Sequence, residues 1–177
     1  MRLFFFVAVV CATTFTAQAQ IYVASQSSIT FFSDAAIEDI KAENRKVESA
    51  LDLGSGVIEF RITMKDFVFN KSLMRQHFNE KYVHSEKYPH ATFQGKIERV
   101  STVPGSYTTT ATGKLVLHGV TRDVTATGTV DVQPGQVRIL SSFMIRLVDY
   151  NIPRPQVLWQ NIAEEVEVKV DITYKPQ

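Results

Sequence analysis

The feature that most constrains the fold is an alternation of apolar and polar residues with a period of two. From residue 166 to residue 174, Val, Val, Val, Ile and Tyr occupy the even positions, whereas Glu, Lys, Asp and Thr occupy the odd ones. Successive side chains of a strand point to opposite faces, so this pattern predicts a strand with one buried and one solvated face. The same alternation predicts strands over 58–64, 91–97, 107–117, 124–132 and 137–147, with weaker candidates at 28–32 and 47–53.

Turn and helix signals interrupt the strands. Glycine and proline lie between the alternating runs at 54–56, 104–105 and 134–135, where tight turns need their backbone angles. Two short helices are expected, 35–41 capped by Ser33 or Asp34, and 73–82 capped by Ser72. About eight strands with one or two short helices predict an all-β domain, either a sandwich or a closed barrel.

The charged rows decide which face of a barrel points inward. The solvated row of the last strand carries Glu165, Glu167, Lys169 and Asp171. An eight-stranded barrel has an interior just wide enough for side chains, and each charge buried there would need a partner. The sequence therefore favours a soluble barrel whose apolar rows face inward.

The inward rows define a candidate binding surface. Small residues interrupt them, including Gly95, Ala111, Gly113, Ala126 and Gly128, and either leave room for a long apolar ligand or mark bends of the wall. No Lys or Arg belongs to the best inward rows, so a charged head group would stay near the mouth. The predicted ligand-binding lining is Phe31, Ile58, Phe60, Ile62, Met64, Phe93, Ile97, Leu115, Leu117, Phe143, Ile145 and Leu147.

The first residues are typical of a secretory signal peptide. Arg2 precedes the apolar run 3–11, and 17–19 reads Ala-Gln-Ala, a small-x-small cleavage site. We therefore expect a signal peptide over 1–19, cleavage after Ala19, and a secreted or periplasmic domain over 20–177. The only cysteine, Cys11, would be lost, so the mature domain would hold no disulfide.

Composition excludes two other classes of partner. The formal net charge of the 177-residue chain is +1, whereas a nucleic-acid-binding domain needs a basic patch. No apolar stretch reaches the roughly 20 residues that span a bilayer, so stable membrane insertion is not expected.

Two segments resemble the paired signatures of the YceI-like family. The first runs from Ser72-Leu73-Met74-Arg75-Gln76-His77-Phe78 through Tyr82 to Lys87-Tyr88-Pro89-His90-Ala91-Thr92-Phe93. The second includes Tyr107 and continues as Thr112-Gly113-Lys114-Leu115-Val116-Leu117-His118-Gly119-Val120-Thr121-Arg122-Asp123-Val124, and 27–31 is similar to the family's opening strand. The two signatures occur in the expected order, and the resemblance runs through the whole mature chain.

The resemblance implies an extended, eight-stranded, antiparallel, lipocalin-like β-barrel in the periplasm. Its interior would sequester or carry a polyisoprenoid, an isoprenoid quinone or a similar apolar lipid. We expect the segment 72–82 to cover one end of the barrel, because its apolar face must be buried. No other cofactor is expected, and a homodimer is left open.

No catalytic or metal-ligating set stands out among the four histidines. His77 and His84 are seven residues apart, which matches no metal-ligand spacing, and no cysteine can join them. We therefore expect no enzyme activity and no metal, with His77 packed at a barrel end and His118 serving its turn.

Two alternatives to lipid carriage are kept. In one, the barrel is an enzyme acting on an acyl or isoprenyl chain, and His77 or His118 is its base; this requires a histidine inside the cavity. In the other, the interior is filled and the protein is a ligand-free stress-response or interaction module.

Overall fold

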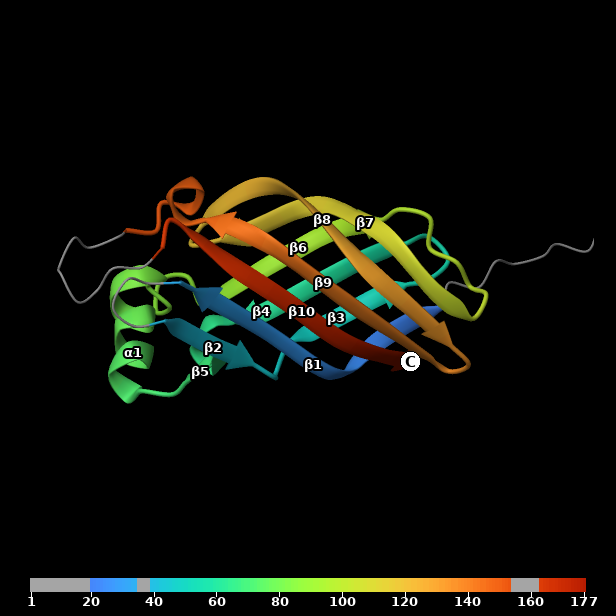
Figure 1. Ribbon diagram of the computed structural model, residues 1–177, viewed down its shortest axis with the longest axis horizontal. Helices are drawn as coiled ribbons and strands as arrows, with labels where there is room; N and C mark the ends of the chain where they lie inside the picture. Colours follow the sequence, from blue (N-terminus) through green and yellow to red (C-terminus); the bar gives the residue numbers. More distant parts are fainter. Residues whose placement is uncertain (1–19, 35–38, 154–162) are drawn as a thin grey trace, which may run out of the picture.

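Antiparallel pairing joins the strands into a sheet that closes on itself (Figure 1). The structure is a computed structural model that describes residues 20–34, 39–153 and 163–177. The predicted signal peptide and its cleavage site therefore lie outside the described residues. The strands are β1 (Ile21–Ser33), β2 (Ile40–Asn44), β3 (Glu48–Asp52), β4 (Val57–Thr63), β5 (Val68–Phe69), β6 (His90–Ile97), β7 (Gly105–Leu117), β8 (Val120–Gln133), β9 (Gln136–Arg146) and β10 (Glu165–Pro176).

The ten strands occupy eight positions around the barrel. One edge of β1 pairs with β10 and closes the sheet. The other edge pairs with β3 over Ile21–Val23 and with β2 over Ile29–Ser33, so β2 and β3 share one position. On the next position, β4 pairs with β3 and the short β5 pairs with β2, so β4 and β5 also share one position. The prediction of a closed, eight-stranded antiparallel barrel is confirmed.

A buried asparagine makes the bend between β2 and β3. Asn44 is completely buried, its Nδ2 donates to the carbonyl of Thr63 at 2.9 Å, and its Oδ1 accepts from the backbone N–H of Lys46 at 2.8 Å. These bonds satisfy backbone groups where the strand breaks and tie the bend to the end of β4.

The first expected helix is wrong where the structure describes it. Ile40 and Lys41 of the predicted helix 35–41 belong to strand β2, and Ser33 lies in β1 rather than at a cap. Residues 35–38 lie outside the description. The backbone of β2 pairs with β1 and with β5, and such long-range pairing overrides a weak local helix signal.

The second helix forms, but Ser72 does not cap it. Helix α1 spans Ser72–His77 with Lys71 at its N-cap and no side-chain capping bond, and the wider turn η2 (Phe78–Tyr82) continues it. Single turns η1 (Met64–Asp66) and η3 (Leu147–Tyr150) follow β4 and β9. None of the helices in the described ranges is long and apolar enough to cross a bilayer.

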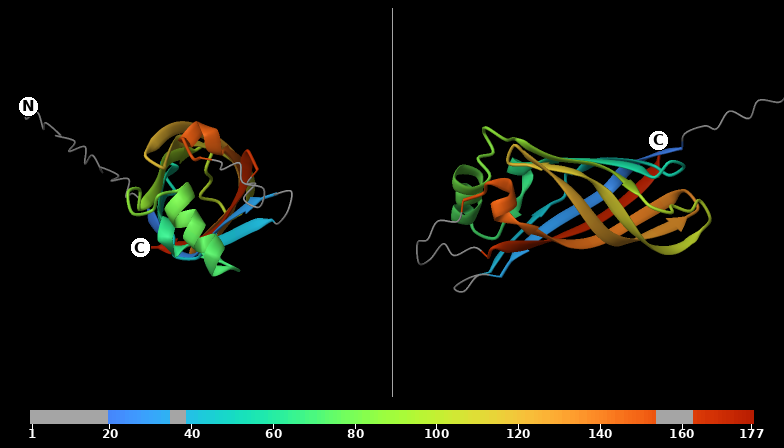
Figure 2. Two further views of the ribbon diagram at one scale, coloured as in Figure 1. Left: turned by 90° about the vertical axis from the view of Figure 1, so that its left-hand side faces the viewer. Right: turned by 90° about the horizontal axis from the view of Figure 1, so that it is seen from above.

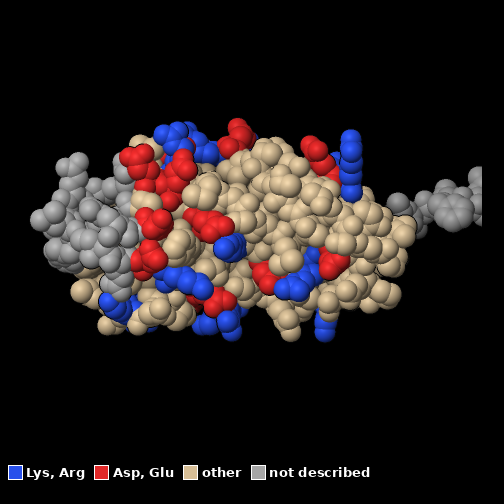
Figure 3. All heavy atoms as spheres, in the orientation of Figure 1, with Lys and Arg blue, Asp and Glu red and all other residues tan. Residues whose placement is uncertain are grey.

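The charged rows lie on the outside of the barrel, as predicted (Figure 3). Arg138 of β9 donates two hydrogen bonds to Asp171 of β10, at 2.8 and 2.7 Å. Lys114 and Asp123 form a similar cross-strand pair at 2.9 Å between β7 and β8. The apolar rows are thereby left for the interior.

One end of the barrel is solidly packed. Tyr174 is completely buried, its hydroxyl lies 2.7 Å from Oγ of Ser49, and that Oγ donates to the carbonyl of Glu59 at 2.7 Å. Because the Ser49 proton is used there, Tyr174 donates to Ser49. We call this packed end the closed end; its core is Tyr22, Leu51, Val130, Val132, Val137, Ile172 and Tyr174.

Candidate functional site

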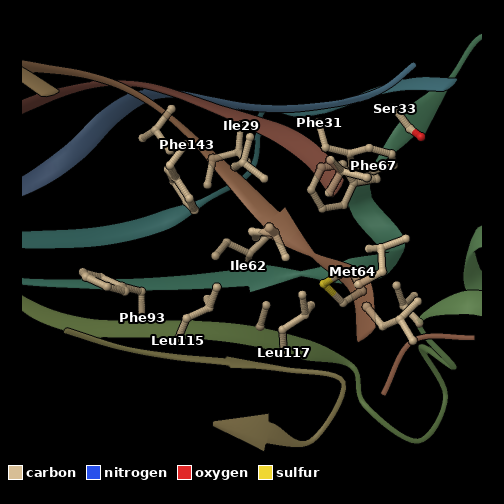
Figure 4. A pocket seen from close by; sticks show the side chains of 18 of the residues that line it. Ile29, Phe31, Ser33, Ile62, Met64, Phe67, Phe93, Leu115, Leu117 and Phe143 are labelled. Atoms are coloured by element: carbon tan, nitrogen blue, oxygen red, sulfur yellow. The ribbon is translucent and has the colours of Figure 1, made fainter. Parts of the chain in front are cut away.

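The rest of the interior is hollow. A cavity of about 400 Å³ occupies the barrel between the closed end and helix α1. That volume lies within the range of about 300–1,000 Å³ typical of small-molecule sites. Figure 4 shows its side chains converging from opposite walls, with Ile62, Leu115 and Leu117 facing Ile29 and Phe143. The alternative in which the interior is filled does not fit this structure.

All twelve residues of the predicted lining border the cavity. From the closed end toward α1, Ile58, Phe60 and Ile62 follow one another along β4. The remaining nine are Phe31, Met64, Phe93, Ile97, Leu115, Leu117, Phe143, Ile145 and Leu147. The structure brings these residues together around one space; their contact with a ligand stays a prediction.

Ile58, Ile97 and Ile139 form the floor of the cavity beside the closed-end core. Ile97 and Ala91 both line the cavity and lie six residues apart on β6. With a rise of about 3.3 Å per residue and a strand tilt of about 40°, this stretch covers about 15 Å along the barrel axis. Such a length accommodates roughly a dozen extended carbon–carbon bonds.

Two of the glycines serve close packing rather than open space. Gly95 and Gly113 are opposite one another on β6 and β7, and the ring of Phe93 lies over both. A Cβ on Gly113 would come within 2.3 Å of the Gln94 carbonyl oxygen. Ala111 and Ala126 do line the cavity, so only the alanines of the small-residue set leave room for a ligand.

The segment Ser72–Tyr82 covers the end of the barrel opposite the closed end, and we call it the lid (Figure 2, left). Leu73, Met74, Phe78 and Tyr82 of the lid line the cavity. Met74, Phe78 and Tyr82 recur at four-residue spacing and form the apolar face that was expected to be buried. Burial raises the pKa of the Tyr82 hydroxyl.

Four phenylalanines anchor the lid, and sequence reasoning found only part of this cluster. Phe78 stacks on Phe31 of β1 with ring centroids 5.3 Å apart, and it contacts Phe67 at 5.6 Å and Phe69 at 5.1 Å. Phe67 and Phe69 also line the cavity but were not predicted to do so. Phe67 directly precedes the two-residue strand β5 and Phe69 belongs to it, and no alternating run there is long enough to give a signal.

The two serine hydroxyls that line the cavity have partners within the protein. Ser33 Oγ accepts from the backbone N–H of Ala163 at 3.0 Å, and Ser141 Oγ donates to the carbonyl of Thr127 at 2.8 Å. Because these groups bond to the protein, the walls present mainly hydrocarbon to the space inside. The charged or titratable groups of the lining are Lys71 and His77, together with Tyr82, and all three belong to the lid or directly precede it.

His118 does not line the cavity. Its Nδ1 donates to the carbonyl of Tyr150 at 3.0 Å, and its Nε2 lies 2.8 Å from Nδ1 of His84. His118 and Gly119 both have positive φ angles, 52° and 74°, as the two-residue turn between β7 and β8 requires. His118 thus ties its turn to η3 and to the loop after the lid, and it is not placed to act as a base on a ligand.

No metal centre is formed by the described part of the chain, in which no three His, Cys, Asp or Glu side chains gather as ligands. His77 is the one histidine that lines the cavity among the residues the structure describes.

Comparison with known proteins relates both the sequence and the fold to other chains. The family model described as a YceI-like domain matches residues 21–174. The comparison with curated proteins gives no match.

Three solved structures share the fold. A polyisoprenoid-binding domain from Saccharophagus degradans is 14% identical, with a TM-score of 0.78 over 90% of this chain and 100% of that chain. BcnA of Burkholderia cenocepacia is 19% identical, with a TM-score of 0.69 over 83% and 95%. The YceI protein of Campylobacter jejuni is 13% identical, with a TM-score of 0.59 over 98% and 93%. The match of the family model over nearly all of the barrel shows that this chain belongs to the YceI-like family.

Proposed function

We propose that this protein is an exported carrier that holds the chain of one apolar lipid, such as a polyisoprenoid or an isoprenoid quinone, inside its barrel. The observation that carries the proposal is the cavity of about 400 Å³ with its hydrocarbon walls, a packed floor and a lid. Burying a hydrocarbon chain there contributes roughly 0.8 kcal/mol per methylene. The polyisoprenoid-binding domain from Saccharophagus degradans, which has the same fold, supports the choice of ligand class.

The head group of the lipid would lie at the lid. Lys71 and His77 are the polar groups at that end of the lining, whereas the floor is formed by isoleucines. A lipid would therefore enter tail first, with its tail toward Ile97 and its head group beside the lid. The sequence of residues 1–19 supports export to the periplasm or beyond.

Binding rather than catalysis is proposed because the walls below the lid offer no base. His77 lines the cavity but belongs to the lid, and His118 lies outside the cavity. The hydroxyls of Ser33 and Ser141 are hydrogen-bonded to the protein.

The proposal is tested by two tryptophan variants of adjacent residues on β7. Leu117 lines the cavity, whereas Val116 lies on the opposite face of the strand. Farnesol, an alcohol with three isoprene units, serves as the probe, and its binding is followed by displacement of the fluorescent dye N-phenylnaphthylamine. We expect Leu117→Trp to abolish farnesol binding and Val116→Trp to preserve it. Equal binding by both variants, or no binding by the unaltered protein, would contradict the proposal.

A further inference from the structure

The barrel wall is interrupted between β8 and β9. The ladder between them pairs Gly128–Gln133 with Gln136–Ser141 and stops there. However, β8 begins at Val120 and β9 continues to Arg146. In Figure 1 the two strands run together at the right and separate toward the end that carries α1. The segments 120–127 and 142–146 therefore face each other without strand pairing.

Both segments are held firmly on their other sides. The segment 120–127 keeps its full ladder with β7, and 142–146 keeps its ladder with β10. The interruption thus belongs to the architecture of the barrel and is not a frayed end.

The interruption has defined limits. At the limit nearer the closed end, Ser141 Oγ donates to the carbonyl of Thr127, where the two strands separate. At the limit nearer the lid, Nε of Arg122 donates to the carbonyl of Asp149 in η3 at 3.0 Å. We call the space between these two hydrogen bonds the side opening.

The side opening lies beside the cavity. Val124 and Ala126 from β8 and Phe143 and Ile145 from β9 all line the cavity, so the hollow interior reaches both edges of the opening. Outside, Met144 of β9 is 55% exposed and places one apolar side chain beside the opening.

The length of the cavity limits how much of a lipid chain can lie inside the barrel. The stretch of wall from Ile97 to Ala91 covers about 15 Å along the barrel axis between the closed end and the lid, which matches roughly a dozen extended carbon–carbon bonds. A longer polyprenyl chain cannot lie straight inside it, and the packed core of Tyr174 and its neighbours blocks the far end.

We propose that the side opening is an exit for the tail of a lipid longer than the cavity, so that the protein binds long-chain polyprenyl lipids with the surplus chain passing between β8 and β9 and resting on Met144. This inference rests on the proposed function and adds to it a ligand class defined by chain length.

A reversible block of the opening tests the inference. Thr125 and Met144 are exposed and lie on its two sides, so the double variant Thr125→Cys/Met144→Cys can be bridged with a short bis-maleimide after folding. The control is Lys96→Cys/Thr112→Cys, whose exposed positions are direct partners in the intact ladder of β6 and β7. The only native cysteine is Cys11, within the expected signal peptide, so the mature variants carry only the new thiols.

The probes are farnesol, whose twelve-carbon backbone fits the cavity, and solanesol, which has nine isoprene units and exceeds it. We expect the bridge at 125 and 144 to weaken solanesol binding by about tenfold or more, because the surplus chain must pull hydrocarbon out of the cavity. Farnesol binding should stay unchanged, and the control bridge should affect neither probe.

Two results would overturn the inference: solanesol binding that is insensitive to the bridge, or equal loss of both probes on bridging. Failure of the unbridged protein to bind farnesol as well as solanesol would instead contradict the proposed function, so the two failures are distinguishable.

Discussion

Filling the floor of the cavity should change ligand affinity and protein stability in opposite directions. Ala111 lines the cavity on β7, where it is paired with Ile97 on one side and Ala126 on the other. Ala111→Leu adds three carbon atoms to the space that the end of a lipid tail would occupy. Thr112→Leu places the same side chain on the exposed face of the same strand and serves as the control.

The expected loss of affinity follows from the displaced hydrocarbon. Three carbons removed from the cavity correspond to about 2.4 kcal/mol at roughly 0.8 kcal/mol per methylene, which is about 60-fold in the dissociation constant. Farnesol binding, measured by displacement of N-phenylnaphthylamine, should weaken by this factor in Ala111→Leu and remain unchanged in Thr112→Leu.

The ligand-free protein should respond the other way. The added leucine carbons contact the isoleucines of the floor, so Ala111→Leu should raise the melting temperature, by about 2–4 °C for each kcal/mol gained. Undiminished farnesol affinity in Ala111→Leu would contradict this prediction, because it would mean that the tail does not reach the floor. A lower melting temperature would show that the floor is already packed.

Three further outcomes are expected. Asn44→Ala should destabilise the protein by about 2–3 kcal/mol in urea unfolding, because two partly buried hydrogen bonds to the backbone are lost; a change below about 0.5 kcal/mol would argue against this role. The Arg138 guanidinium lowers the pKa of Asp171, so the pair should stabilise the fold above about pH 4 and lose its effect as the pH falls through the lowered pKa. Arg138→Ala should flatten that acid dependence, and an unchanged stability profile between pH 5 and 3 would contradict the pairing. Phe78→Ala should speed amide hydrogen exchange in the lid while leaving β6 and β7 protected, because the lid loses its stacking on Phe31; uniform exchange across the barrel would speak against a separately anchored lid.

The alternation of residue types was sufficient to predict which face of each strand points inward. It placed Ile58, Phe93, Leu115 and Phe143 on one surface, although they come from four different strands. The reason is physical, because a one-residue shift would turn a charged row into the interior.

The same signal could not distinguish the cavity from the closed end. Ile172 and Tyr174 have the same parity as Val170 and Val168, but the first two are packed in the core and the last two line the cavity. An alternation with a period of two shows which face of a strand a residue lies on, but not its position along the barrel axis. That position depends on which side chains meet across the barrel, such as Tyr174 and Ser49.

Local signals also failed where long-range pairing decided the structure. The alternation around Ile40 is confined to residues 40–43, too short to predict a strand, and the strand exists because β1 and β5 pair with it. The Phe67–Phe69 part of the aromatic cluster was missed for a similar reason, since its partners Phe31 and Phe78 are distant in sequence or separated by turns. The interruption between β8 and β9 was not predicted, because the apolar–polar pattern reports the face of a strand and not its pairing; the departure from alternation at Leu140-Ser141 in β9 gave no such information.

The central claim is that the barrel carries a lipid, and the most direct measurement is the native mass of the mature protein, recovered from the exported fraction without detergent. The account predicts a bound species of several hundred daltons that is released into organic solvent and behaves as an isoprenoid. A protein that shows only its ligand-free mass, and that also fails to take up added farnesol or solanesol, would contradict the account.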